Sequence, residues 1–289
     1  LPSSNRLTQG IAYVKYLLPA FRSIYEDLKI YLGVSGVEVN KDNTRPVNKS
    51  VDSNINQDII FENKIELRRV AFNYSDKSRV FKDIDLTINK GESVAFIGPT
   101  GSGKTTLVDL ICGFYEPCNG DVLIDGVSRN SYSKASWNKL FGYVPQIIYL
   151  FDDSIKRNVA FGLDDKDIDE EKVWHCLRQA NLDVFVKNLE DDINTIIGEN
   201  GISLSGGQRQ RLGIARALYH DPQILVFDEA TSALDNKTEK EVTDAINAAA
   251  SGRTMITIAH RMSTVEKADR VYKIEKSKID LVVMEVIGE

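Results

Sequence analysis

The sequence predicts an α/β fold in which a largely parallel sheet is covered by helices, with antiparallel hairpins near its start. Two observations lead to this prediction. Beyond residue 200, apolar runs of strand length alternate with helical patterns, an order that is typical of parallel sheets. Between residues 64 and 97, strand-like runs instead follow one another with no helical pattern between them, which favours hairpins.

The first 32 residues predict an amphipathic helix. Apolar residues recur there at alternating steps of four and three, which places them on one helical face. They are Ile11, Val14, Leu18, Phe21, Tyr25, Leu28 and Leu32. Pro19 lies inside this pattern and predicts a kink. The helix could pack on its own domain, but we favour the end of a longer helix, because a polar segment separates it from the rest of the chain.

Residues 33–60 are expected to form a solvated linker, since 33–58 are rich in Asn, Asp, Ser and Lys and show no apolar period. After the linker, strands are expected at 64–72, 84–88, 93–97, 121–124, 224–227 and 254–258. Helices are expected at 105–112, 172–180, 208–219 and 237–249.

Composition and charge exclude several classes of protein. The 289 residues carry 42 acidic and 36 basic side chains, a net charge of −6, and no run rich in Lys and Arg, which argues against duplex DNA as the main partner. No segment approaches the roughly 18 consecutive apolar residues of a membrane-spanning helix. A chain of this length buries a core without disulfides or metals.

The ends and the cysteines suggest a reduced fragment of a longer protein. Cys112, Cys118 and Cys176 lack the spacing of a zinc site or a disulfide framework, so all three are expected to fill the core in a reducing compartment. The chain opens at Leu1, with neither a methionine nor the pattern of a signal peptide, so we expect the natural start to be missing.

The strongest motif is Gly98-Pro99-Thr100-Gly101-Ser102-Gly103-Lys104-Thr105, which fits G-x-x-x-x-G-K-[ST] between an apolar strand and a helix. In such a P-loop, backbone N–H groups and the positive end of the helix dipole surround phosphate oxygens. Lys104 supplies a charge for the β- and γ-phosphates, and the Thr105 hydroxyl is a Mg²⁺ ligand. The alternative is a glycine-rich turn with a chance lysine.

A second motif is the apolar run 224–227, which ends in Asp228 and Glu229. A buried parallel strand would deliver both acids to the carboxyl edge of the sheet, where ligands of such sheets bind. Asp228 is then suited to hold Mg²⁺, and Glu229 to orient or deprotonate an attacking water. Alternatively, the pair caps the next helix.

A third motif, Leu204-Ser205-Gly206-Gly207-Gln208, opens a helix and forms a second anion-binding surface. One nucleotide has one triphosphate, which the P-loop already holds. Two phosphate-binding helix ends in one chain therefore predict that each nucleotide lies between two copies of the domain.

Together these motifs resemble the ATP-binding cassette (ABC) family, over almost all of residues 61–275. The resemblance implies a P-loop NTPase (RecA-like) core with a mostly parallel sheet, an antiparallel β subdomain and a helical subdomain at about 152–218. The ABC ATPase domain is then expected at 61–289. Its implied activity is hydrolysis of ATP with Mg²⁺ as cofactor, in a symmetric head-to-tail homodimer with two competent ATP sites.

The resemblance also assigns roles to single residues. Tyr74 is similar to the aromatic that stacks on adenine; an ordinary strand aromatic is the alternative. Gln146 resembles the glutamine that touches Mg²⁺ and water and senses the membrane partner. Asp235, at the end of Ser-Ala-Leu-Asp, resembles the key acid of a loop that crosses the dimer interface. His260, 31 residues beyond Glu229, matches the histidine that hydrogen-bonds the γ-phosphate.

The implied site has three sets of residues. Ser205 and Gly207 are expected to contact the γ-phosphate held by the opposite subunit. The catalytic set is Glu229, His260, Gln146 and Lys104. The ATP-binding set is Tyr74, Thr100, Gly101, Ser102, Gly103, Lys104, Thr105, Thr106, Ser205, Gly206, Gly207, Gln208 and Asp235. The metal set is Thr105, Gln146 and Asp228.

Within the family, two segments resemble exporters. Residues 195–201 are similar to the loop that contacts the intracellular ends of the membrane helices, and 154–162 to the exporter segment after the glutamine. A helix cap and a polar turn are the alternative for both. In exporters the membrane domain precedes the ATPase on the same chain, and residues 1–32 resemble the cytoplasmic end of its last helix. The resemblance therefore implies a domain at the cytoplasmic face of the inner membrane, fused to a transmembrane domain that we expect to be missing from this chain.

The likeness is strongest to bacterial flippases for lipid-linked oligosaccharides and to lipid-A-type transporters, which implies an amphipathic substrate. No nucleic acid is expected as a partner. A soluble ABC ATPase that acts on ribosomes or nucleic acid is the alternative function; the 101 residues between Lys104 and Ser205, without a heptad run, argue against it. A cassette that binds ATP without hydrolysing it is a further alternative. Residues 277–289 fit no part of the family pattern.

Overall fold

The computed structural model describes residues 59–74, 79–198, 201, 204–229, 236–259, 265 and 267–282. The chain divides into two compact units, Leu1–Asp52 and Ser53–Glu289, and all described residues belong to the second. The predicted amphipathic helix of residues 1–32 and the linker up to residue 58 lie outside the described residues. In the described ranges, no helix is long and apolar enough to cross a bilayer.

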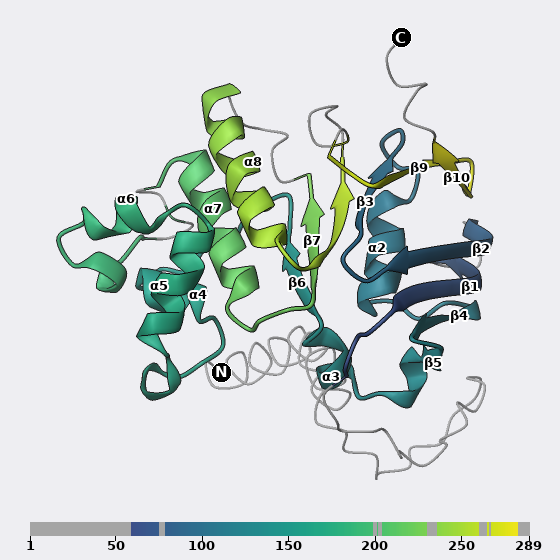
Figure 1. Ribbon diagram of the computed structural model, residues 1–289, viewed down its shortest axis with the longest axis horizontal. Coiled ribbons are helices and arrows are strands. Elements are labelled where there is room, and N and C mark those ends of the chain that lie inside the picture. Colours follow the sequence, from purple (N-terminus) through teal and green to yellow (C-terminus); the bar gives the residue numbers. More distant parts are fainter. Residues whose placement is uncertain are drawn as a thin grey trace, which may run out of the picture. The chain divides into compact units, whose positions relative to one another are not determined.

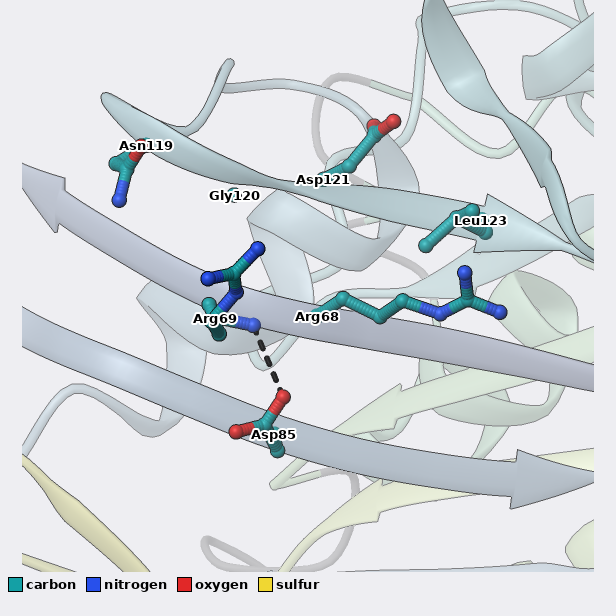
Figure 2. Close-up of a pocket in the computed structure, with 7 residues that line it drawn as sticks. All are labelled: Arg68, Arg69, Asp85, Asn119, Gly120, Asp121 and Leu123. Carbon is teal, nitrogen blue, oxygen red and sulfur yellow. Dashed lines mark hydrogen bonds between the residues drawn. The ribbon is translucent and has the colours of Figure 1, made fainter.

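An antiparallel sheet forms the first layer (Figure 1). Its strands are β1 (Lys64–Asn73), β2 (Arg79–Asn89), β4 (Asn119–Ile124) and β5 (Val127–Ser128), in the order β2-β1-β4-β5. The register of β1 shifts between Arg68 and Ala71, where Arg69 takes a positive φ of 48°. This bulge helps to form a surface pocket, shown in Figure 2, which is lined only by residues of β1, β2 and β4 and contains no P-loop residue.

The second sheet is parallel apart from one edge strand. Its order is β10-β9-β3-β8-β7-β6, and only β10 runs antiparallel to its neighbour. The strands are β3 (Ser93–Ile97), β6 (Phe141–Val144), β7 (Ile224–Asp228), β8 (Thr254–Ile258), β9 (Arg270–Glu275) and β10 (Lys278–Val282).

The first four residues of β7 are apolar because both faces of the strand are covered. Ile224 and Val226 pack into the core shared with the antiparallel sheet and α2 (Lys104–Cys112). Leu225 and Phe227 point to the opposite side, into the core of the helical region. The alternation of side chains along a strand thus lets β7 hold two cores together.

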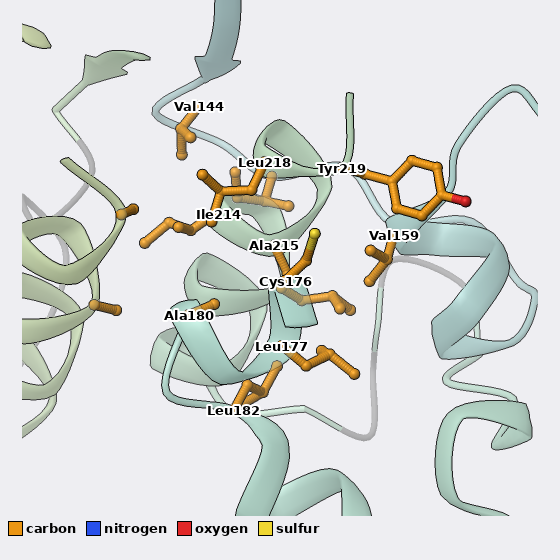
Figure 3. Packing of buried hydrophobic residues seen from close by; sticks show 14 of the residues in the cluster. Val144, Val159, Cys176, Leu177, Ala180, Leu182, Ile214, Ala215, Leu218 and Tyr219 are labelled. Carbon is orange, nitrogen blue, oxygen red and sulfur yellow. The ribbon is translucent and has the colours of Figure 1, made fainter. Parts of the chain in front are cut away.

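The helical region consists of α4 (Ile155–Val159), α5 (Glu170–Gln179), α6 (Asp183–Lys187), α7 (Gly206–Leu218) and α8 (Asn236–Ala250). Figure 3 shows Cys176 and Leu177 of α5 packed with Ile214 and Leu218 of α7. The remaining short helices are α3 (Lys134–Asn138) and the 3₁₀ turns η1 (Arg129–Ser131), η2 (Asp165–Asp167) and η3 (Asp192–Asn194). The predicted α/β class and its four longer helices are confirmed.

Three expectations need correction or extension. Cys112 and Cys176 are buried as expected, but Cys118 is exposed, with its Sγ 3.0 Å from Asn73 Oδ1. It lies just before the first residue of β4, outside the buried cores. Strands β6 and β9 were not expected. Residues 278–282, which fitted no pattern, form β10, and the turn into it places Lys276 and Ser277 at positive φ.

Candidate active site

The P-loop connects β3 to α2. Gly103 is the N-cap of α2 and has a φ of 104°, which glycine adopts readily and other residues rarely. A Cβ at this position would lie 2.8 Å from Phe81 Cζ, so the close approach of β2 also requires glycine. The loop therefore has the backbone that the motif predicts, and it ends at the amino end of a nine-residue helix.

Lys104 points back into the loop. Its Nζ donates hydrogen bonds to the carbonyl oxygens of Gly98 at 2.9 Å and Pro99 at 3.0 Å, and the residue is only 5% exposed. Burial lowers the pKa of Lys104, while the charges of Glu229 and Asp228 act in the opposite direction. Two carboxylates are thus close enough to stabilise this ammonium group.

Polar atoms of the loop fit a phosphate group. Ser102 Oγ is buried and has no hydrogen-bond partner among the residues that the structure describes. A buried hydroxyl without a partner is costly, and a phosphate oxygen would satisfy it. Thr105, in the first turn of α2, is exposed and available to a ligand.

The two acids at the carboxyl end of β7 differ in burial. Asp228 ends the strand and is buried, whereas Glu229 is partly exposed, with a φ of 48°. The Glu229 amide donates to Ile258 O at 3.1 Å, which holds this strained backbone against β8. Gln146, in the loop after β6, donates from Nε2 to Glu229 Oε2 at 2.7 Å.

Sequence reasoning missed two polar residues near Asp228. Tyr143, on β6, donates from its hydroxyl to Asp228 Oδ2 at 3.1 Å. Asp109, on α2, has its pKa raised to about 6, chiefly by burial and further by the charge of Asp228. Neither residue belongs to a motif, and only the pairing of β6 with β7 and the position of α2 bring them to the acids.

The donor set suits a cation that is bound mainly by phosphate oxygens. Among the described residues, no group of three or more acidic, histidine or cysteine side chains forms a metal site of its own. Thr105, Gln146 and Asp228 offer a hydroxyl, an amide oxygen and a carboxylate, which are the oxygen ligands Mg²⁺ takes beside substrate phosphates. These residues therefore fit Mg²⁺ bound together with a nucleotide.

Ser205 caps α7. Its Oγ accepts from Gln208 N at 3.2 Å, and Gln208 Oε1 accepts from Ser205 N at 2.8 Å, so the pair forms a capping box. Gly207 faces α8, and a Cβ there would lie 2.1 Å from Thr238 Cγ2. The close contact between α7 and α8 of the same copy is thus enough to explain the glycine at position 207.

Tyr74 lies just beyond β1 and is 53% exposed. Its hydroxyl lies 2.6 Å from Thr106 Oγ1, and its ring meets those of Phe72 and Tyr115 edge-on. The aromatic ring therefore stands beside the P-loop helix. Two predicted site residues, Asp235 and His260, lie outside the described residues, as does the rest of the segment 230–235.

A family model described as ABC transporter matches residues 81–232, which include the P-loop, both acids and the capped α7. The chain belongs to the ABC transporter family. Its described region is the family's ATP-binding domain, with the P-loop NTPase core and the two additional subdomains that the resemblance implies.

Two curated relatives show how this ABC domain compares with longer proteins. It is 43% identical over 216 residues to the ABC transporter ATP-binding protein YwjA of Bacillus subtilis (strain 168), covering 75% of this chain and 37% of that one. It is 44% identical over 224 residues to the ATP-dependent lipid A-core flippase of Cupriavidus pinatubonensis (strain JMP 134 / LMG 1197), covering 77% and 37%. The matched region is thus little more than a third of either relative.

A solved structure of an ABC exporter is also similar to this domain over part of its length. A bacterial Atm1-family ABC exporter with ATP bound superimposes with a TM-score of 0.72 and 32% identity, covering 94% of this chain and 46% of that chain. The ABC domain therefore resembles those of exporters. Nothing in the names of these relatives points to ribosomes or nucleic acid.

The two exporter-like segments of the ABC domain lie next to each other. Ser154 and Ile196 form an antiparallel bridge, and Ile155 N donates to Thr195 O at 3.1 Å. Ser154 also caps α4, because its Oγ accepts from Arg157 N at 3.3 Å. Ser154 is thus a helix cap within an exporter-like segment, and the bridge to Ile196 joins this segment to the other one.

Proposed function

We propose that this domain binds ATP with Mg²⁺ and hydrolyses it to ADP and phosphate. The observation that carries the proposal is the convergence of four side chains at one edge of the sheet. The Lys104 ammonium group is influenced by the charges of Asp228 and Glu229, and Gln146 hydrogen-bonds Glu229. Phosphoryl transfer needs little more than such positioning and neutralisation of charge.

Each of these side chains has its own role in the proposed hydrolysis. Glu229 accepts a proton from a water whose oxygen attacks the γ-phosphorus, and the bond from that phosphorus to the β–γ bridging oxygen breaks. Lys104 and the loop N–H groups neutralise charge on the β- and γ-phosphates. Gln146 keeps the Glu229 carboxylate in place. Bound Mg²⁺, held by Thr105, Asp228 and Gln146, supplies further neutralisation of phosphate charge.

A second copy of the chain completes the site in this proposal. Ser205 is exposed at the amino end of α7, where backbone N–H groups and the helix dipole favour an anion. Ser205 and Gly207 of each copy would face the γ-phosphate held by the other, in a head-to-tail homodimer around two ATP. Asp235 and His260 are assigned to the interface and to the γ-phosphate by the family resemblance.

An apolar surface supports a membrane domain as the second partner. Ile147 and Tyr149, directly after Gln146, are 63% and 67% exposed, and Phe151 stacks on Phe161 with ring centroids 4.7 Å apart. Ile196, on the other exporter-like segment, is also exposed. Exposed apolar groups so close to Gln146 suit docking of the cytoplasmic ends of membrane helices, which would then affect Glu229 through Gln146.

The proposed role of the whole protein follows from this partner. ATP hydrolysis would power an exporter or flippase with a fused transmembrane domain, at the cytoplasmic face of the inner membrane. The relative named lipid A-core flippase supports a lipid-linked or other amphipathic substrate. No nucleic acid is part of the proposal, in line with the net charge of −6.

The test is phosphate release from ATP by this chain, with Lys104→Ala and a matched control. Lys166, whose side chain is 76% exposed, provides the control variant Lys166→Ala. We expect Lys104→Ala to lose hydrolysis and to bind ATP more weakly, and Lys166→Ala to behave like the unmodified chain. Equal activity of the two variants would contradict the proposal.

A further inference from the structure

Tyr143 links Asp228 to the core that contains α2. Strands β6 and β7 are parallel, and Tyr143 is level with Val226, two residues before Asp228. Since side chains alternate along a strand, Tyr143 and Asp228 are on the same face, and the tyrosine hydroxyl reaches Asp228 Oδ2 at 3.1 Å. Three residues further along the chain, Gln146 reaches Glu229.

The ring of Tyr143 is held in this position by packing. It meets Phe114 edge-on, with centroids 5.9 Å apart and an interplanar angle of 79°, and it packs against the core that contains α2. The hydroxyl is thus held where it donates a hydrogen bond to the Asp228 carboxylate.

We propose that Tyr143 is a positioning residue for Asp228, holding its carboxylate in the orientation that binds Mg²⁺ together with ATP. The proposal rests on the proposed function, because it takes Asp228 as a Mg²⁺ ligand. A hydrogen bond at Oδ2 restricts rotation of the carboxylate, so less freedom is lost when the cation binds. Tyr143 touches neither nucleotide nor cation in this account and acts only through Asp228.

The variant Tyr143→Phe tests the proposal because it keeps the ring and its contact with Phe114 and removes only the donor. The measurement is the affinity for a non-hydrolysable ATP analogue, by calorimetry, with EDTA and with saturating Mg²⁺. We expect the gain in affinity that Mg²⁺ produces to fall about tenfold, as for the loss of one hydrogen bond to a charged group. The affinity in EDTA should change by less than about twofold.

Two further variants make the result specific. Tyr132→Phe is the matched control: Tyr132 packs on Trp137, and its hydroxyl has no hydrogen-bond partner in the described part of the chain, so no change is expected. In a chain that already carries Asp228→Asn, the additional change Tyr143→Phe should not alter the gain in affinity that Mg²⁺ produces. A thermal melt of each variant shows whether it is folded.

The outcomes separate this inference from the proposed function. If the unmodified chain binds the analogue no better with Mg²⁺ than with EDTA, the Mg²⁺ role of Asp228 is wrong and the inference falls with it. If the unmodified chain responds to Mg²⁺ and Tyr143→Phe responds equally, only the inference is wrong. An equal loss of affinity with and without Mg²⁺ would also overturn it, because it would indicate a general defect of the site.

Discussion

Gln146 Nε2 donates a hydrogen bond of 2.7 Å to Glu229 Oε2, although the two residues are 83 positions apart. The strand β6 delivers Gln146, and β7, its parallel neighbour, delivers Glu229. The contact connects two parts of the proposed mechanism. Gln146 directly precedes the exposed apolar surface, and Glu229 is the acid proposed to accept a proton from water. A displacement of that loop would therefore change the position of Glu229.

Gln146→Ala should lower the rate of ATP hydrolysis at saturating ATP about tenfold or more, because the Glu229 carboxylate loses its positioning contact. The affinity for ATP should stay within about threefold, since Gln146 contributes one interaction among many at the phosphates. Steady-state phosphate release gives both quantities. A variant with full turnover and weakened ATP binding would show that Gln146 is only a binding residue.

Tyr74→Ala should weaken ATP binding about 5- to 150-fold, because stacking of a base on an aromatic ring is worth about 1–3 kcal/mol. Tyr74→Phe keeps the ring and loses only the contact with Thr106, so its affinity should stay within about fivefold. Equilibrium binding of ATP checks both variants. Equal affinities for the alanine and phenylalanine variants would leave Tyr74 as an ordinary surface aromatic.

The sequence predicts much of this architecture, because several elements carry their own local signals. The helix α7 begins at a capping box of Ser205 and Gln208, and apolar periodicity marks its length. The strand β7 is a continuous apolar run up to Asp228 and lies between two layers. The P-loop is recognisable because its glycines and Lys104 form one contiguous motif whose residues all serve phosphate binding.

Other features depend on packing that the sequence does not display. The strand β6 has four residues, one of them Gly142, and is recognised only once β7 lies beside it. The turn at Lys276 and Ser277 places two residues without glycine's freedom at positive φ. Tyr143 reaches Asp228 across 85 positions of sequence, so its role depends on the register of two strands.

Asp109→Asn should change how stability depends on pH. Burial raises the pKa of Asp109 from 3.8 to about 6 in the folded state, so the folded chain binds this proton more tightly than the unfolded chain. The stability contributed by Asp109 is therefore greatest at low pH and falls as the pH rises from about 4 to about 6.

The asparagine variant removes this titration. A rise of about two pKa units corresponds to at most about 3 kcal/mol, and partial exposure of the side chain reduces the expected gain to about 1 kcal/mol. Urea unfolding at about pH 8 should show Asp109→Asn to be more stable than the unmodified chain, and at about pH 4 no such gain should remain. A gain of the same size at both pH values would rule out titration of Asp109 as its cause.

Arg216→Lys should destabilise the helical region. The guanidinium donates to Asn158 O at 2.7 Å, Asn158 Oδ1 at 2.9 Å and Tyr149 O at 2.7 Å, and a lysine cannot make this fork of bonds. We expect a loss of about 2–4 kcal/mol in the free energy of unfolding, measured with urea.

The matched control is Arg68→Lys. Arg68 pairs with Glu66 at 3.0 Å on the exposed face of β1, and such surface pairs contribute less than about 1 kcal/mol. If Arg216→Lys and Arg68→Lys have the same free energy of unfolding, the hydrogen bonds around Asn158 contribute little to stability.

The central claim is that Glu229 promotes attack of water on ATP bound at the P-loop. Its most direct test is the initial rate of phosphate release by Glu229→Gln at saturating Mg²⁺ and ATP, because this variant keeps the shape of the side chain and removes its capacity to accept a proton. We predict that the rate falls about 100-fold or more while ATP binding is retained and an ATP-bound dimer accumulates. An unchanged rate of hydrolysis in Glu229→Gln would contradict the account.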